Sequence, residues 1–269
     1  MLAEWARGSS TAERMFTIGQ INGPIMPPTK SFRTYSSSLR VKALDGTKNV
    51  MPEQVQHTLY QVSTATALVE GIYQGAVRVS TLREHGDLGL GTFEGLDGEM
   101  VIVDGHFFQV RSDGSVREVQ ENVLSPFAAV TAFSSDQAIT LDYCRDLSYL
   151  TSQFDALRSS DNFFFALRVD GTFEYIHARA MRRTKEGVPL VQAAAVQPEF
   201  EFQNVSGTLV GFWTPEYAKS LNVPGYHLHF VLGTAHMADM SCSAEENIFA
   251  CRFSGKAITT SCCPKPKIF

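Results

Sequence analysis

Three closely spaced Asp-Gly pairs limit the folds that are open to this chain. The pairs are Asp97-Gly98, Asp104-Gly105 and Asp113-Gly114. Asp-Gly supplies the positive φ angles that a tight hairpin turn requires. The segments between the pairs, EMVIVDG and HFFQVRSDG, are short and apolar, and GAVRVS before them alternates apolar with polar residues. A period of two is typical of strands, so residues 75–117 are predicted to form an antiparallel meander.

The rest of the chain mixes expected helices with further strands. Residues 58–71 carry apolar side chains at helical spacing before a glycine, which predicts a short helix, and residues 141–157 have a similar helical pattern. Another hairpin is expected about Asp170-Gly171, and SGTLVGFWTP and GYHLHFVL are predicted to be two more strands. The predicted fold class is α+β, with two layers of mostly antiparallel or mixed sheet, a few helices and two similar subdomains.

These elements divide the chain into four segments. Residues 1–55 are rich in Ser, Thr, Pro and Gly and have weak periodicity, so they are predicted to be an irregular leader. Residues 56–160 are the expected N-terminal α+β subdomain. Residues 161–232 contain the closely spaced histidines His227 and His229 and are the expected C-terminal, zinc-binding subdomain. Residues 233–269 lose the pattern and are interpreted as an aberrant tail, which leaves the second subdomain truncated.

Charge and hydropathy argue against two classes of partner. The net charge is -5 and the 23 Lys and Arg residues are scattered, whereas nucleic-acid binding requires a concentrated basic surface. No apolar run approaches the roughly 20 residues that a membrane-spanning helix needs. The first residues include Glu4 and lack the apolar core of a signal peptide. A cytoplasmic protein that binds neither nucleic acid nor membrane is the expectation.

Two histidines in the stretch GYHLHFVLGTAH are the strongest sign of a metal site. Alternate side chains of a strand share a face, so His227 and His229 are predicted to point the same way, about 7 Å apart along the strand. A catalytic zinc site uses three protein ligands and an open fourth position. His236, or a residue elsewhere, is the candidate third ligand. The alternative is a satisfied core histidine next to a surface one.

Several long segments occur in order along residues 59–232. They are LYQVSTATALVEGIYQG, HGDLGLGTFEGLDGEMVIVDGHFFQVRSDG, SPFAAVTAF, FFFALRVDG, QPEFEFQNVSGTLVGFWTPEYA and VPGYHLHF. Together they resemble the acetolactate decarboxylase family, zinc enzymes that convert 2-acetolactate to acetoin and carbon dioxide. The resemblance implies a small-molecule substrate, a Zn²⁺ cofactor and a role in acetoin biosynthesis.

The resemblance also assigns roles to four residues. The HLH pair supplies His227 and His229 as zinc ligands, the LDGE turn supplies Glu99, and IHAR supplies Arg179. Zinc acts as a Lewis acid on the charge that decarboxylation leaves. Arg179 is expected to hold the departing carboxylate or to donate to the developing anion, and Glu99 to orient the substrate hydroxyl and manage its proton. Without the resemblance, both would be interpreted as surface charges.

The family pattern stops after Leu232. The family continues with Gly-Gly-His-Val, whose histidine is the third zinc ligand, and this chain has no such motif. Read from the third nucleotide of each codon, the codons for residues 233–241 permit Gly-Gly-His-Val, and four of the five cysteines crowd residues 242–263. The hypothesis is a frameshift or mis-spliced junction near codon 233, so that residues 233–269 are translated out of frame. His236 would then lie near the other two histidines only by chance.

This hypothesis leaves three functions open. Two histidines hold zinc more weakly than three, and the lost strands would expose a sheet edge, so the chain is expected to be a poor decarboxylase or an inactive one. The second possibility is a non-catalytic remnant of the same fold that binds a partner or metabolite. The third, a different zinc hydrolase, lacks a nucleophile or base motif. A homodimer formed by sheet pairing is the expected assembly.

Overall fold

The structure is a computed structural model that describes residues 18–22, 58–141, 143–233 and 249–258. It has the predicted α+β fold with mostly antiparallel strands. One long sheet has the strand order β13-β12-β11-β14-β2-β9-β4-β5-β6-β7, with β1 paired to β11 and β10 to β14. The β14–β2 pair, which joins the two halves of this sheet, is parallel. Within the described residues, no helix is long and apolar enough to span a membrane.

The N-terminal half of the sheet contains the predicted meander. Its strands are β2 (Thr58–Val62), β4 (Leu88–Thr92), β5 (Glu99–Val103), β6 (His106–Val110), β7 (Val116–Glu118) and β9 (Phe127–Thr131), with the short pair β3 (Val77–Arg78) and β8 (Leu124–Ser125) beside it. Strands β4 to β7 pair antiparallel in sequence order. The glycines of the three Asp-Gly pairs have positive φ angles, which confirms the turns.

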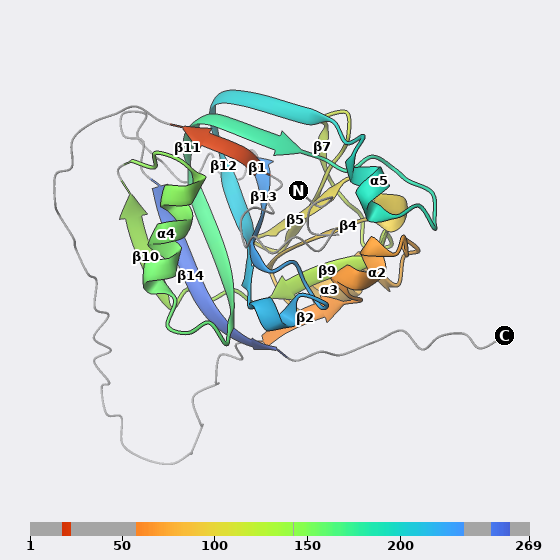
Figure 1. Cartoon of the computed structure of the whole chain (residues 1–269), viewed down its shortest axis with the longest axis horizontal. Coiled ribbons are helices and arrows are strands. Elements are labelled where there is room, and N and C mark those ends of the chain that lie inside the picture. The colour runs from red at the N-terminus through yellow and green to blue at the C-terminus, as the bar shows by residue number, and fades with distance from the viewer. Residues whose placement is uncertain (1–17, 23–57, 142, 234–248, 259–269) are drawn as a thin grey trace, which may run out of the picture.

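The C-terminal half is built on two long strands. Its strands are β1 (Ile18–Asn22), β10 (Gln137–Leu141), β11 (Phe164–Arg179), β12 (Glu199–Thr214), β13 (Gly225–Leu232) and β14 (Phe249–Ile258). Figure 1 shows β11 and β12 arching together over the top of the molecule, from the side of α4 (Leu147–Leu157) towards the side of α5 (Leu190–Ala194). Their ends therefore reach the region of the N-terminal half.

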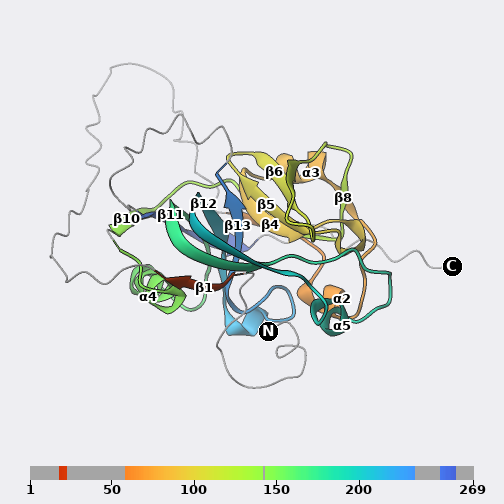
Figure 2. The ribbon, with the colours of Figure 1, turned by 90° about the horizontal axis from the view of Figure 1, so that it is seen from above.

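The remaining helices are short and lie at the periphery. They are α2 (Ala65–Val69), α3 (Val79–Arg83) and the 3-10 turns η1 (Glu94–Leu96) and η2 (Glu216–Ala218). Figure 2 shows α2 and α5 side by side below the N-terminal half. The backbone N–H of Gly187 donates to the carbonyl of Gly71 at 2.9 Å, which ties the segment before α5 to the end of α2.

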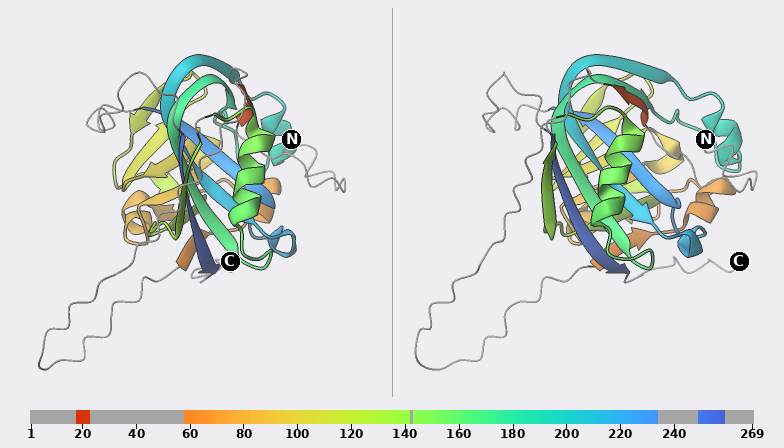
Figure 3. Two further views of the ribbon diagram at one scale, coloured as in Figure 1. Left: turned by 90° about the vertical axis from the view of Figure 1, so that its left-hand side faces the viewer. Right: turned by 60° about the vertical axis from the view of Figure 1, so that its left-hand side comes forward.

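Two of the four buried hydrophobic clusters in the described part of the chain lie against the C-terminal half. The first lies between the halves, where Val101 of β5 and Leu90 of β4 pack in one cluster with Val210 and Phe212 of β12 and Val231 of β13. The second lies on the outer face of the C-terminal half, which α4 covers (Figure 3). Side chains of β13 alternate between the two cores, so residues 227, 229 and 231 face the N-terminal half.

The predicted hairpin at Asp170-Gly171 is wrong. Strand β11 continues through both residues, and Gly171 pairs with Gly207 of β12. The reason is a buried ion pair that outweighs the turn tendency: Arg168 Nε donates to Asp170 Oδ2 at 2.8 Å, and Thr208 Oγ1 donates to Asp170 Oδ1 at 2.8 Å. The carboxylate is thereby bound by Arg168 of its own strand and Thr208 of β12 and is not part of a turn.

The predicted helices are shorter than expected. Residues 58–62 form β2, because Tyr60 pairs with Val130 of β9 and both faces of the strand are buried. The helix over 58–71 is therefore confirmed only in its second half, where Thr64 caps α2. In residues 141–157 the helix begins at Leu147, because the Asp146 carboxylate accepts from the Tyr149 N–H at 2.7 Å.

Parts of the predicted leader and tail belong to the sheet. Within the leader, Ile18–Asn22 pairs with β11. Within the segment interpreted as an aberrant tail, Phe249–Ile258 pairs with β11, β10 and β2 and occupies the middle of the strand order. The other residues of both segments lie outside the described part of the chain.

The ion pair in β11 gives a test of this topology. Arg168 is 5% exposed and Asp170 8% exposed, whereas the side chain of Asp104, which also contacts Arg168, is 63% exposed. We expect Asp170→Asn to lower the free energy of unfolding by about 3 kcal/mol, because it leaves a buried guanidinium without its buried counter-charge. Asp104→Asn is expected to cost less than about 1 kcal/mol. Urea unfolding measures both, and equal losses would contradict the assignment.

Candidate metal and substrate site

His227 and His229 project from the same face of β13. They pair in the backbone register with Phe212 and Val210 of β12, and the alternation of the strand brings their rings together. The ring centroids are 4.9 Å apart and the two Nε2 atoms 3.1 Å apart. The predicted convergence of the two imidazoles is therefore present, and it is closer than the spacing along a strand alone implies.

The hydrogen bond of His229 determines which of its nitrogens faces His227. Its Nδ1 lies 2.9 Å from the carbonyl oxygen of Met100 on β5. A carbonyl only accepts, so Nδ1 carries the proton and Nε2 presents a lone pair. The main chain of the N-terminal half thereby orients a donor atom that lies on the C-terminal half.

Both imidazoles are neutral at ordinary pH. Burial lowers the pKa of His229 to about 4, against a smaller opposing effect of its hydrogen bond to Met100. Burial and then the neighbouring His229 ring lower the pKa of His227 well below its usual value. Nδ1 of His227 is buried and has no hydrogen-bond partner among the described residues. Neutral imidazole is the form that binds metals.

Glu99 completes this cluster from the start of β5. Its Oε1 accepts from the backbone N–H of Met181 at 3.0 Å, and its Oε2 lies 3.6 Å from Nε2 of His229. Burial raises the pKa of Glu99 to about 7, and the hydrogen bond from Met181 opposes that rise. The carboxyl group of Glu99, which is far from both histidines in the sequence, thus meets the two imidazoles between the halves of the sheet.

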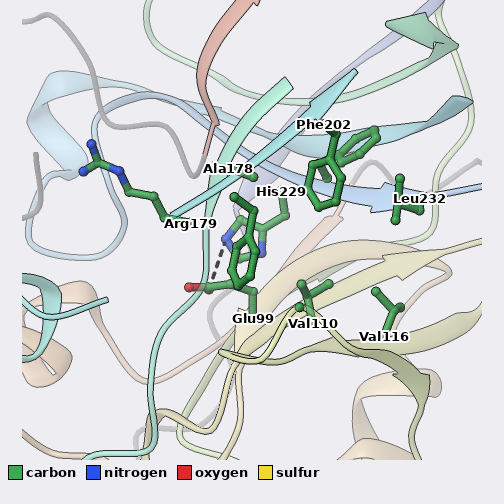
Figure 4. Close-up of a pocket in the computed structure, with 11 residues that line it drawn as sticks. Glu99, Val110, Val116, Ala178, Arg179, Phe202, His229 and Leu232 are labelled. Atoms are coloured by element: carbon green, nitrogen blue, oxygen red, sulfur yellow. Dashed lines mark ion pairs between the residues drawn. The ribbon is translucent and has the colours of Figure 1, made fainter. Parts of the chain in front are cut away.

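A small cavity opens beside Glu99 and His229. Its volume is about 30 Å³, which is enough to hold a water molecule. Figure 4 shows Val110, Val116, Phe202 and Leu232 on the side away from Arg179. The wall around the polar groups is mostly apolar, which keeps water away from them and strengthens electrostatic interactions inside.

Arg179, at the end of β11, lines this cavity without pointing into it. Figure 4 shows its side chain extending away from Glu99 and His229. Its Nη2 lies 3.2 Å from Oε1 of Glu199, the residue opposite it on β12. The structure therefore brings the backbone of Arg179 to the site and leaves its guanidinium outside.

The third predicted ligand, His236, lies outside the described residues. Among the residues that are described, no group of three or more His, Cys, Asp or Glu side chains is arranged to hold a metal ion. Sequence reasoning also missed the backbone groups of Met100 and Met181. It had no signal for them, since every residue carries the same carbonyl and N–H.

Comparison with known proteins identifies the family. The model of the family described as alpha-acetolactate decarboxylase matches residues 59–247. The chain belongs to this family. The alpha-acetolactate decarboxylase of Methanosarcina mazei is 46% identical over 192 residues, which cover 70% of this chain and 67% of that protein. That of Bacillus licheniformis is 42% identical over 174 residues, covering 64% and 69%.

Solved structures agree with the family membership. A crystal structure of alpha-acetolactate decarboxylase from Bacillus subtilis has a TM-score of 0.69 and 35% identity, covering 76% of this chain and 88% of that chain. The sequence alone predicted that the resemblance ends at residue 232. The range matched by the alpha-acetolactate decarboxylase model extends further and ends at residue 247.

The hydrogen bond between Glu99 and Met181 provides a test of how the candidate site is assembled. We expect Glu99→Ala to lower the free energy of unfolding by about 2 kcal/mol, because it leaves a buried N–H without an acceptor. Glu99→Gln keeps an oxygen in that place and is expected to cost less than about 1 kcal/mol. Thermal and urea unfolding of both variants measure this, and an equally large loss in Glu99→Gln would show that the charge matters more than the bond.

Proposed function

We propose that this chain decarboxylates 2-acetolactate to acetoin and carbon dioxide, and that His227 and His229 hold the Zn²⁺ ion that the reaction needs. The convergence of two neutral imidazoles beside a mostly buried carboxyl, in a chain of the alpha-acetolactate decarboxylase family, carries the proposal. The substrate is the one that the relatives' names specify.

The two histidines fit zinc. Two nitrogens that bind one tetrahedral zinc ion at about 2.05 Å are about 3.3 Å apart, and the Nε2 atoms of His227 and His229 are separated by 3.1 Å. The Met100 carbonyl holds His229 in the tautomer whose Nε2 is free to bind. A zinc ion bound there supplies a Lewis acid that stabilises the negative charge left by decarboxylation.

The side chains around this position have distinct tasks. The bond between the carboxylate carbon and C2 breaks, its electron pair passes to the neighbouring ketone, and a proton finally replaces the carboxyl group. Arg179 turns into the cavity and holds the substrate carboxylate with its planar guanidinium. Oε2 of Glu99, on the side of His229, accepts the hydrogen bond of the substrate hydroxyl and manages its proton.

The apolar wall takes the methyl groups of the substrate. Val110, Val116 and Phe202 lie across the cavity from Arg179, so a substrate with its carboxylate on Arg179 directs its alkyl part towards them. The cavity is small, about 30 Å³, so we expect side chains at its wall to move when the substrate binds.

Removal of either histidine tests the proposed zinc site. We expect His227→Ala and His229→Ala each to lower zinc content from near one per chain to near zero, and acetoin formation by about 100-fold or more, because the remaining imidazole cannot hold the ion alone. His106→Ala, which changes an exposed histidine on β6, is the control and keeps both. Metal analysis and an acetoin assay measure the outcome. Wild-type protein with neither zinc nor acetoin formation would instead identify a non-catalytic remnant.

The role of His236 is tested separately. A site with two imidazoles binds zinc more weakly than one with three, so we expect the chain to lose zinc to a chelator more readily than its relatives and to be the slower enzyme. His236→Ala is expected to leave the zinc dissociation constant within about 2-fold of wild type, in keeping with a fortuitous histidine. A loss of about 10-fold or more, the effect of removing a true ligand, would make His236 the third ligand.

A further inference from the structure

Glu199 binds two residues of β11 at once, next to the cavity. It lies directly opposite Arg179 in the register of β11 and β12. Its Oε1 is 3.2 Å from Nη2 of Arg179, and its Oε2 is 2.9 Å from Nε2 of His177. His177 and Arg179 are two residues apart and share a face of the strand, so one carboxylate is held between them.

This contact determines where the guanidinium of Arg179 lies. Figure 4 shows the side chain leaving the cavity wall in the direction opposite to Glu99 and His229. Nε of Arg179 is buried and has no hydrogen-bond partner among the described residues. The guanidinium is thus only partly satisfied in this position, and Glu199 supplies the one ion pair that the described residues give it.

We infer that Glu199 is a positioning residue that holds Arg179 out of the cavity and competes with the substrate carboxylate for its guanidinium. This inference rests on the proposed function. Both anions are carboxylates that pair with a guanidinium, but Glu199 binds it outside the cavity and the substrate carboxylate lies inside, so the guanidinium cannot serve them together in one position. Substrate binding therefore includes an exchange of one carboxylate partner for another.

The exchange is feasible because the pair with Glu199 is weak. The side chains of Arg179 and Glu199 are 26% and 51% exposed, and ion pairs that open to water shift an equilibrium by only about 2- to 5-fold. His177 gives Glu199 a second partner on the same face, because it lies 2.9 Å from the other carboxylate oxygen. The carboxylate stays on the outer face of β12 when Arg179 turns inward.

The substitution Glu199→Gln tests the competition. It keeps the size of the side chain and removes its charge. We expect KM for 2-acetolactate to fall by about 2- to 5-fold while kcat stays within about 2-fold, because the substrate no longer displaces an anion. Glu201→Gln is the matched control: Glu201 lies two residues further along β12, opposite His177, and its substitution is expected to leave both constants unchanged.

A binding measurement separates this inference from the proposed function. The probe is 2-hydroxy-2-methylpropanoate, which keeps the carboxylate and the tertiary hydroxyl but lacks the ketone needed for decarboxylation. Calorimetry on the zinc-loaded protein is expected to give about 2- to 5-fold tighter binding in Glu199→Gln than in wild type and Glu201→Gln. Equal affinities in all three proteins would overturn the inference even if acetoin is formed. Tighter binding in Glu199→Gln without acetoin formation by wild type would support it and refute the proposed function.

Discussion

The hydrogen bond from His229 to the Met100 carbonyl is the interaction on which the site depends. It joins β13 of one half of the sheet to β5 of the other across a buried interface, at 2.9 Å. Both partners are removed from water, so losing the bond would leave an unpaired polar group in the core. The same hydrogen bond fixes the tautomer of His229. The packing of the two halves therefore also determines the orientation of the donor atoms. Glu99 is brought in by the same contact, since it directly precedes Met100 in β5.

Local signals in the sequence predicted the parts of the fold that local energetics decide. The Asp-Gly turns and the alternation of β13 are properties of a few neighbouring residues, and the structure contains both. The hairpin at Asp170-Gly171 was predicted by the same reasoning and is wrong, because Arg168 and Thr208 engage the carboxylate inside a continuous strand. Residues 58–62 resemble a helix by spacing, yet pairing with β9 makes them a strand. In both places tertiary contacts outweigh the local tendency.

The candidate site also contains features that local sequence predicts and features that only tertiary contacts decide. The convergence of His227 and His229 follows from strand alternation, whereas Glu99 and Arg179 were predictable only from the family resemblance. Their positions depend on contacts between residues that are far apart in the chain, such as Glu99 with Met181. The backbone partners have no side-chain signature. Strand pairing also lacks a side-chain signature, because main-chain hydrogen bonds do not depend on the side chain. Phe249–Ile258 therefore takes a central place in the sheet although its sequence shows no period.

Charge balance connects the proposed zinc, the substrate and the retracted position of Arg179. The imidazoles of His227 and His229 are neutral, so a divalent ion between them would bring two positive charges into a buried site, where uncompensated charge is costly. The Glu99 carboxylate would offset one of these charges, which leaves one positive charge in the site until the substrate carboxylate enters. If Arg179 faced inward before the substrate arrived, its positive charge would add to that of the ion without compensation. Paired with Glu199 at the edge of the sheet, the guanidinium is neutralised until a carboxylate enters, and the anion of the substrate is itself what makes the inward position favourable.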